Sequence, residues 1–227
     1  MSYNNLTFSN LATLEQRQLP ILRVGSADIP RRAVETLSSG GVIVFPTDTV
    51  YGVGCRIDND AAVRRVYALK KRPRTDGLPV LLADVAQLDQ YARDVPAVAR
   101  RLVGRFWPGA LTVVVRRSER VSSLVAGGGS TVALRVPNHA VPRALVRTQG
   151  VPIVGTSANT HGLPSPATAQ QAVFDLGDQV DLVLDGGRVP GGRESTVVDV
   201  TTDTPRVLRE GAIAARDIEN AVSAMTR

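Results

Sequence analysis

Two lysines stand side by side near the end of a predicted helix, and they are the only lysines among 27 basic residues. Lys70 and Lys71 are followed by Arg72 and Pro73. A lysine ammonium is a compact point charge and an arginine guanidinium a planar fork, so this pair of types suits a triphosphate. Pro73 ends the helix, which lets Lys70 and Arg72 point into one cleft. The alternative is that these cations only stabilise the helix C-terminus through its dipole.

Polar loops follow two predicted buried strands, Val42–Phe45 and Val151–Val154. The first loop, 46–54, is rich in hydroxyls and glycine, and the second, 155–159, carries hydroxyl and amide side chains. A third polar segment, 194–199, lies near the C-terminus. Open α/β sheets bind ligands at such strand ends. The competing interpretation of each segment is an ordinary capping turn.

Arg135 lies in an otherwise apolar predicted strand, Val132–Val136, which follows a loop containing Gly127, Gly128 and Gly129. A buried arginine needs an anionic partner, which is either a ligand or a structural ion pair. A glycine-rich backbone can also form a concavity for anions.

The chain has 227 residues, 43% of them hydrophobic, and strands alternate with helices without a break in composition. This pattern predicts an α/β fold: a single domain with a twisted mixed parallel/antiparallel sheet flanked by helices. Residues 1–25 are expected to form an N-terminal arm or strand, and residues 26–227 the α/β domain. The net charge of +6 favours an anionic partner and an open, positively charged cleft, although a solvated basic surface is the alternative.

Several function classes lack their sequence signals. There is no Gly-x4-Gly-Lys-Ser/Thr loop and no dinucleotide fingerprint. One cysteine and two histidines cannot build a zinc cage, and a lone cysteine fits a reducing cytoplasm. No apolar run is long enough to cross a membrane, and no secretory signal is evident.

In order along the chain, the polar segments resemble those of the YrdC/TsaC family. The resemblance runs from about Ile29 to Ile213 and rests on these segments: Pro46–Gly54, Lys70–Pro73, Trp107–Gly109, Val132–Pro137, Ser157–Asn159, Ser195–Asp199 and Leu208–Gly211.

The resemblance implies an L-threonylcarbamoyladenylate synthase, a nucleotidyltransferase. Such enzymes form threonylcarbamoyl-AMP and pyrophosphate from L-threonine, bicarbonate or CO2 and ATP, in the first step of the threonylcarbamoyladenosine modification of tRNA. The product passes to a downstream threonylcarbamoyl-transfer complex. A phosphoryl-type transfer needs positioning and charge neutralisation more than a covalent nucleophile, so few histidines and cysteines suffice.

The resemblance also implies roles for individual residues. Lys70 and Arg72 would be the catalytic pair on the phosphates. The ATP site as a whole would comprise Lys70, Arg72, Asp76, Thr131, Ser157, Asn159, Ser165 and Arg209. The threonine site would comprise Thr49, Arg135 and Ser195. Mg²⁺ is expected to be carried by the triphosphate, with no metal site of the protein's own.

Leu81 departs from the family pattern, because some members carry a histidine there, at the threonine pocket. The chain also resembles the short form of the family, with 14 residues after Ile213 and no extra C-terminal domain.

Two other functions compete with the synthase. One is a non-catalytic module of the same fold that binds double-stranded RNA or tRNA, which the basic charge favours. The aromatic content of 4% disfavours a reader that stacks single-stranded bases. The other is a carbamoyl-adenylate domain like that of hydrogenase-maturation carbamoyltransferases, which the absence of their accessory regions disfavours.

Overall fold

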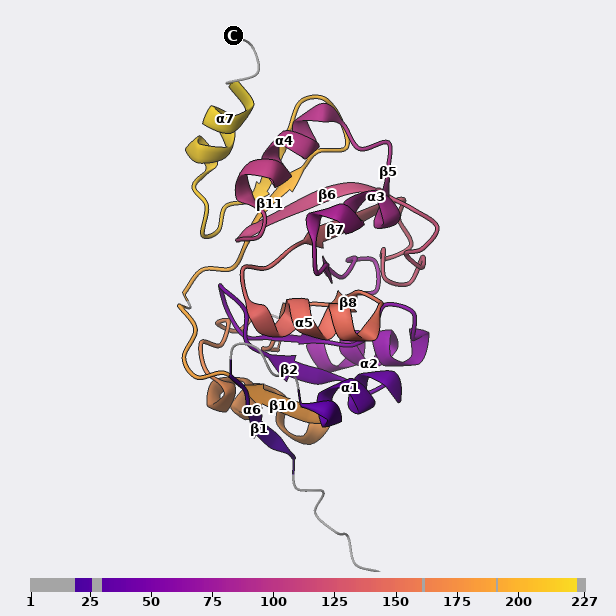
Figure 1. The fold of residues 1–227 in the computed structure, drawn as a ribbon, viewed down its shortest axis with the longest axis vertical. Helices are drawn as coiled ribbons and strands as arrows, with labels where there is room; N and C mark the ends of the chain where they lie inside the picture. The colour runs from indigo at the N-terminus through magenta and orange to yellow at the C-terminus, as the bar shows by residue number, and fades with distance from the viewer. Residues whose placement is uncertain (1–18, 26–29, 161, 191, 224–227) are drawn as a thin grey trace, which may run out of the picture.

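The computed structural model describes residues 19–25, 30–160, 162–190 and 192–223. Its strands form two hydrogen-bonded sheets, with seven helices and two short 3-10 turns in the described part of the chain (Figure 1). The mixed α/β class predicted from the sequence is confirmed, but the strands are divided between two sheets where the sequence suggested one. Of the predicted N-terminal arm or strand at 1–25, residues 1–18 lie outside the described residues, and Ile21–Arg23 form a strand.

The five-stranded sheet has the order β1-β10-β2-β3-β9. Its three parallel strands are continued by the antiparallel pairs β2–β3 and β3–β9. The strand bounds are β1 Ile21–Arg23, β2 Ile43–Phe45, β3 Gly52–Gly54, β9 Thr156–Ser157 and β10 Leu182–Asp185.

The seven-stranded sheet has the order β12-β11-β6-β7-β4-β8, with β5 paired to β6. It is also mixed, since β11–β6 and β4–β7 are parallel and β6–β7 is antiparallel. The strand bounds are β4 Val80–Leu81, β5 Ala92–Arg93, β6 Leu111–Arg117, β7 Thr131–Arg135, β8 Ile153–Val154, β11 Thr196–Asp199 and β12 Arg206–Arg209.

Helices cover the sheets on the faces that carry their apolar side chains. In the five-stranded sheet, Ile43 and Phe45 pack with α1 and α5, whereas Val44 between them joins the main core with α2 and α6. This alternation is the period of two of a strand buried on both faces. The helix bounds are α1 Arg31–Ser38, α2 Asp60–Lys70, α3 Leu88–Tyr91, α4 Ala97–Phe106, α5 Ala140–Gln149, α6 Ala169–Leu176 and α7 Ala215–Ser223; the 3-10 turns are Val85–Gln87 and Gly177–Gln179.

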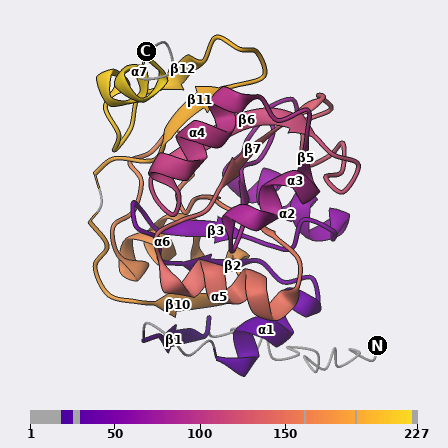
Figure 2. The same cartoon turned by 45° about the horizontal axis from the view of Figure 1, so that its top comes forward.

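Helix α5 contacts β4 of the seven-stranded sheet in the apolar cluster that contains Leu81. Elsewhere on this sheet, α4 packs on β6, and α7 packs on α4 (Figure 2). Leu111, Val113 and Leu134 belong to the core on this side. Residues of the opposite parity along the same strands therefore point the other way, toward the five-stranded sheet. No described helix is long and apolar enough to cross a membrane.

The two sheets meet where the chain passes from β8 to β9. β8 pairs with β4 in one sheet and β9 with β3 in the other, and only Gly155 separates them. The amide of Gly155 donates to the carbonyl of Pro79 at 2.9 Å. A Cβ at this position would lie 2.4 Å from the side chain of Leu81, so only glycine fits this close approach.

Candidate active site

A pocket of about 440 Å³ lies between the two sheets. The seven-stranded sheet contributes residues of a single parity, as its pleat requires. These residues are Thr112 and Val114 of β6, Ala133 and Arg135 of β7, and Ser195 and Val197 at β11. The facing wall comes from the loop after β2 and from the segment that begins with β9. The pocket is therefore a consequence of the two-sheet architecture.

Helix α2 delivers Lys70 to one end of the pocket. Asn59 caps the start of the helix by accepting a hydrogen bond from the amide of Ala62 at 3.0 Å. The helix ends at Lys70, because Lys71 adopts the left-handed conformation with φ of 49°. This turn leaves Lys70 buried and Lys71 exposed, and Arg72 lines the same pocket.

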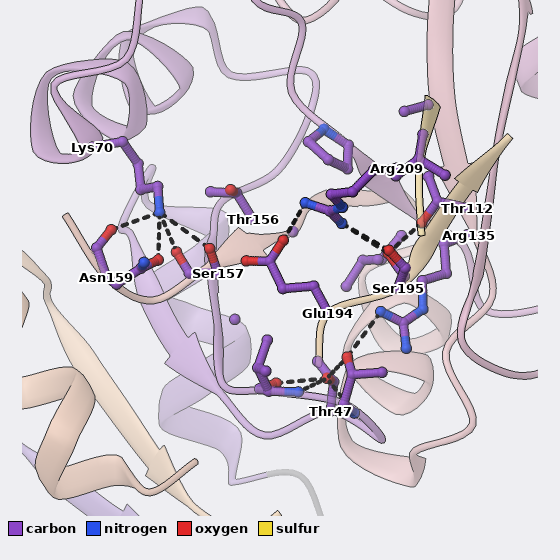
Figure 3. Close-up of a pocket in the computed structure, with 18 of the residues that line it drawn as sticks. Thr47, Lys70, Thr112, Arg135, Thr156, Ser157, Asn159, Glu194, Ser195 and Arg209 are labelled. Atoms are coloured by element: carbon purple, nitrogen blue, oxygen red, sulfur yellow. Dashed lines mark hydrogen bonds and ion pairs between the residues drawn. The ribbon is translucent and has the colours of Figure 1, made fainter. Parts of the chain in front are cut away.

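The ammonium of Lys70 is surrounded by oxygens. Its Nζ lies 2.6 Å from the carbonyl oxygens of Ser157 and Asn159, and 2.8 Å from Oδ1 of Asn159 (Figure 3). Burial lowers the pKa of Lys70 to about 8, with the charge of Glu194 opposing the shift.

Glu194 and Arg209 form an ion pair across the pocket from Lys70 (Figure 3). The second carboxylate oxygen of Glu194 accepts from the hydroxyl of Ser165 at 2.6 Å, and Arg209 donates to the carbonyl of Ser195 at 2.9 Å. Burial alone would raise the pKa of Glu194, but the hydrogen bond from Ser165 and the charge of Arg209 help to hold it below its ordinary value. Glu194 is therefore ionised near neutral pH.

Arg135 is held in place by three groups of the protein. Its Nε donates to the carbonyl of Gly109 at 2.9 Å, one terminal nitrogen to Oγ1 of Thr49 at 3.1 Å, and the other to Oδ1 of Asp48 at 2.6 Å. Burial lowers its pKa, and the charge of Asp48 opposes this effect. The buried arginine thus has the structural ion pair that was one of its two predicted explanations, and it still lines the pocket.

Eight of the eleven residues singled out from the sequence line this pocket: Thr49, Lys70, Arg72, Arg135, Ser157, Asn159, Ser195 and Arg209. The other three are not among its lining residues. Asp76 is exposed and contacts Arg72 through its backbone oxygen, Thr131 lies at the start of β7, and Ser165 reaches the pocket only through Glu194.

The prediction that the glycine loop forms an anion-binding concavity is wrong, because its three glycine amides bond to backbone carbonyls. The amides of Gly127, Gly128 and Gly129 donate to the carbonyls of Leu124, Ser123 and Ala126. These hydrogen bonds close tight turns and use the N–H groups that an anion would need. None of the three glycines lines the pocket.

Several polar residues at the site have no role predicted from the sequence, among them Glu194, Asp48 and Thr112. Glu194 and Asp48 each adjoin a predicted site residue, and adjacency was the only available signal. Thr112 is a polar residue in the apolar strand β6, and its Oγ1 lies 2.8 Å from Oγ of Ser195. A search for polar residues of one parity within strands would have found it.

The pocket lining combines four cations with one carboxylate. Lys70, Arg72, Arg135 and Arg209 against Glu194 give a formal charge of 4 − 1 = +3 among the lining residues. No group of three or more potential metal ligands occurs among the described residues. Cys55 is buried away from this lining, and burial raises the pKa of its thiol to about 12.

Comparison with known proteins places this chain in a family. The profile of the Sua5/YciO/YrdC family, described as telomere recombination, matches residues 35–211. The chain therefore belongs to the Sua5/YciO/YrdC family, and the resemblance of its polar segments to the YrdC/TsaC family is confirmed.

Individual relatives agree with this membership. The threonylcarbamoyl-AMP synthase of Bacillus subtilis is 40% identical over 189 residues, which cover 83% of this chain and 55% of the relative. The enzyme of the same name from Saccharophagus degradans is 42% identical over 174 residues, 76% of this chain and 90% of the relative. The chain thus spans about half the length of the first relative and most of the second.

A solved structure is similar to this chain over most of its length. The crystal structure of Pyrococcus abyssi Sua5 complexed with L-threonine has a TM-score of 0.83 and 36% identity, covering 89% of this chain and 60% of that chain.

Proposed function

We propose that the chain is an L-threonylcarbamoyladenylate synthase, a nucleotidyltransferase that makes threonylcarbamoyl-AMP and pyrophosphate from L-threonine, bicarbonate or CO2, and ATP. The observation that carries the proposal is the meeting of Arg72, Arg135 and Arg209 in one pocket with hydroxyl and amide side chains. The names of the relatives and the threonine complex of the Pyrococcus protein support it.

The proposed chemistry fits a site without a protein nucleophile. The amine of threonine combines with CO2 to give a carbamate, and a carbamate oxygen attacks the α-phosphorus of ATP while pyrophosphate leaves. The protein has to bring two anions together and neutralise charge as it develops. We propose that the excess of cations in the lining serves this purpose.

The threonine end of the site would be built around Arg135. Of its five N–H groups, three bond to the protein within the described residues, so 5 − 3 = 2 remain for a carboxylate. A carboxylate can take two such bonds at once. Thr49 and Ser195 lie in the same lining and supply hydroxyls for the amino acid.

The nucleotide end would use Arg72, Arg209, Ser157 and Asn159, with Lys70 in the same site. Arg72 spends two N–H groups on the carbonyls of Asp76 and Gly77 within the described residues, so 5 − 2 = 3 remain for phosphate oxygens. Nucleotide contacts by Asp76, Thr131 and Ser165 remain predictions.

Mg²⁺ is proposed to arrive with the triphosphate. Glu194 is the one carboxylate in the pocket lining, and it is already engaged by Arg209 and Ser165. This donor set does not fit a magnesium ion held by the protein, because Mg²⁺ needs several oxygen ligands in octahedral geometry.

The wider setting of the reaction also remains a proposal. It comprises the cytoplasmic location, the transfer of the product to a threonylcarbamoyl-transfer complex acting on tRNA, direct contact with RNA, and the division into an arm at 1–25 and a catalytic domain at 26–227. A purely RNA-binding role is less well supported, since the relatives carry the names of enzymes.

Pyrophosphate release tests the proposed function. We expect release from ATP when L-threonine and bicarbonate are both present, and only background release when either is omitted. L-Serine in place of threonine is a matched control for the amino-acid site. ATP turnover that is indifferent to threonine would contradict the proposal, and RNA binding without turnover would favour the binding module.

A further inference from the structure

All three N–H groups of the Lys70 ammonium can be assigned to hydrogen bonds within the protein. Its Nζ lies within 2.6 to 2.8 Å of three oxygens, the carbonyls of Ser157 and Asn159 and the side-chain Oδ1 of Asn159. Oγ of Ser157 is a fourth neighbour at 3.3 Å. A lysine ammonium has three N–H groups, so these three short bonds account for all of them.

Arg72 differs from Lys70 in this respect, although the sequence predicts the same phosphate contact for both. Arg72 is half-buried and lines the pocket, and only two of its five N–H groups bond to the protein within the described residues. Lys70 is 2% exposed. A phosphate that took Lys70 as a ligand would have to break charge-assisted hydrogen bonds in a buried position, which are among the strong ones in proteins.

All the short-range partners of Lys70 belong to one segment, Ser157–Asn159. On its other side, this segment is bound to β3 by the β9 pairing and by the amide of Ala158, which donates to the carbonyl of Tyr51 at 2.8 Å. The side-chain amide of Asn159 is also oriented by a hydrogen bond that its Nδ2 donates to the carbonyl of Leu163. Three oxygens gathered at one buried point would repel each other without a cation between them.

We propose that Lys70 is a positioning residue that fixes the Ser157–Asn159 segment in the shape that receives the nucleotide, and that it is not itself a phosphate ligand. This inference rests on the proposed nucleotide site. According to this inference, Arg72 contacts the phosphates directly, whereas the charge of Lys70 orders the Ser157–Asn159 segment.

Binding of two ligands to three variants tests the inference. Lys70→Met keeps the length of the side chain and removes the ammonium, Lys70→Arg keeps a positive charge but replaces the compact donor by a planar fork, and Lys71→Asn removes the neighbouring exposed charge with a residue that tolerates the left-handed conformation. Each is titrated with adenosine and with ATP by calorimetry.

We expect Lys70→Met and Lys70→Arg to weaken the binding of adenosine and the binding of ATP by the same factor, about tenfold. Both ligands depend on the ordered segment. Lys71→Asn should bind both ligands as the unmodified chain does.

A direct phosphate contact predicts a different pattern. Lys70→Met would then weaken the binding of ATP but not that of adenosine, and Lys70→Arg would retain ATP binding. Either result overturns the inference. Should Lys70→Met not fold, Lys70→Arg still separates the two cases. If the unmodified chain binds ATP but releases no pyrophosphate with threonine and bicarbonate, the proposed function fails while the role of Lys70 is still decided by these titrations.

Discussion

Arg135 donates to the carboxylate of Asp48 at 2.6 Å, and both side chains are largely withdrawn from water, with 8% and 15% of their surface exposed. Arg135 belongs to β7 of the seven-stranded sheet, and Asp48 to the loop after β2 of the five-stranded sheet. Their ion pair therefore connects the walls of the pocket as well as orienting the arginine.

Removal of Asp48 should destabilise the fold. Breaking a buried pair leaves an uncompensated charge, so Asp48→Ala is expected to lower the free energy of unfolding by about 3 kcal/mol. Asp89→Ala is the matched control, because the Asp89–Arg100 pair is 61% and 53% exposed. Its cost should stay below about 1 kcal/mol. Urea denaturation measures both, and equal costs would show that the Asp48 pair is no stronger than a surface pair.

Removal of the guanidinium of Arg72 should abolish phosphate recognition without unfolding the chain. Arg72→Gln is expected to weaken ATP binding by at least about tenfold, because charge-assisted bonds to phosphate are lost. Its circular dichroism spectrum should be unchanged, since Arg72 bonds only to two nearby carbonyls. Lys71→Asn serves again as the charge-matched control. A variant that binds ATP normally would remove Arg72 from the site.

The contact between Gly155 and Leu81 should be sensitive to a single methyl group. Gly155→Ala would place a Cβ 2.4 Å from the buried side chain of Leu81, and we expect a loss of about 1 to 3 kcal/mol in stability. Adding Leu81→Ala should recover part of this loss relative to the sum of the two single changes. Thermal denaturation of the four proteins measures the coupling; strictly additive losses would mean that the two side chains do not compete for space.

Adenosine affinity should fall as the pH rises through about 8. Burial lowers the pKa of Lys70 to about 8, with Glu194 and Asp175 raising it and Arg72 lowering it. The protonated form dominates below this pH and supplies all three N–H groups; above it, one donor is lost and the Ser157–Asn159 segment loosens. The fall should be absent in Lys70→Met. A pH-independent affinity in the unmodified chain would contradict the assignment.

The elements that carry an apolar run or a helical repeat could be predicted from the sequence, and two strands within polar segments could not. The end of α2 at Lys70 follows from Pro73, and β2 from a run of apolar residues. Strands β3 and β9 have three and two residues and lie in segments that the sequence predicts to be loops. They are defined by pairing with each other and with β2, and such pairing leaves no local periodicity.

The candidate site shows the same boundary between local and non-local information. The family resemblance identified eight members of the pocket lining, but their partners depend on contacts between distant segments. The sequence of the 127–129 loop does not reveal that its amides are spent inside the turns. Nor does the spacing of Lys70 and Arg72 reveal that one ammonium is saturated by residues 87 and 89 positions away, while its neighbour keeps free donors.

Direct detection of the product tests the central claim of a threonylcarbamoyladenylate synthase. The chain is incubated with ATP, L-threonine and ¹³C-bicarbonate, and the nucleotide products are resolved by mass spectrometry. We predict a threonine-containing adenylate that gains a single mass unit from the labelled carbon and is absent without threonine. An adenylate that carries no label from bicarbonate, or the recovery of ATP unchanged by a chain that binds it, would contradict the account.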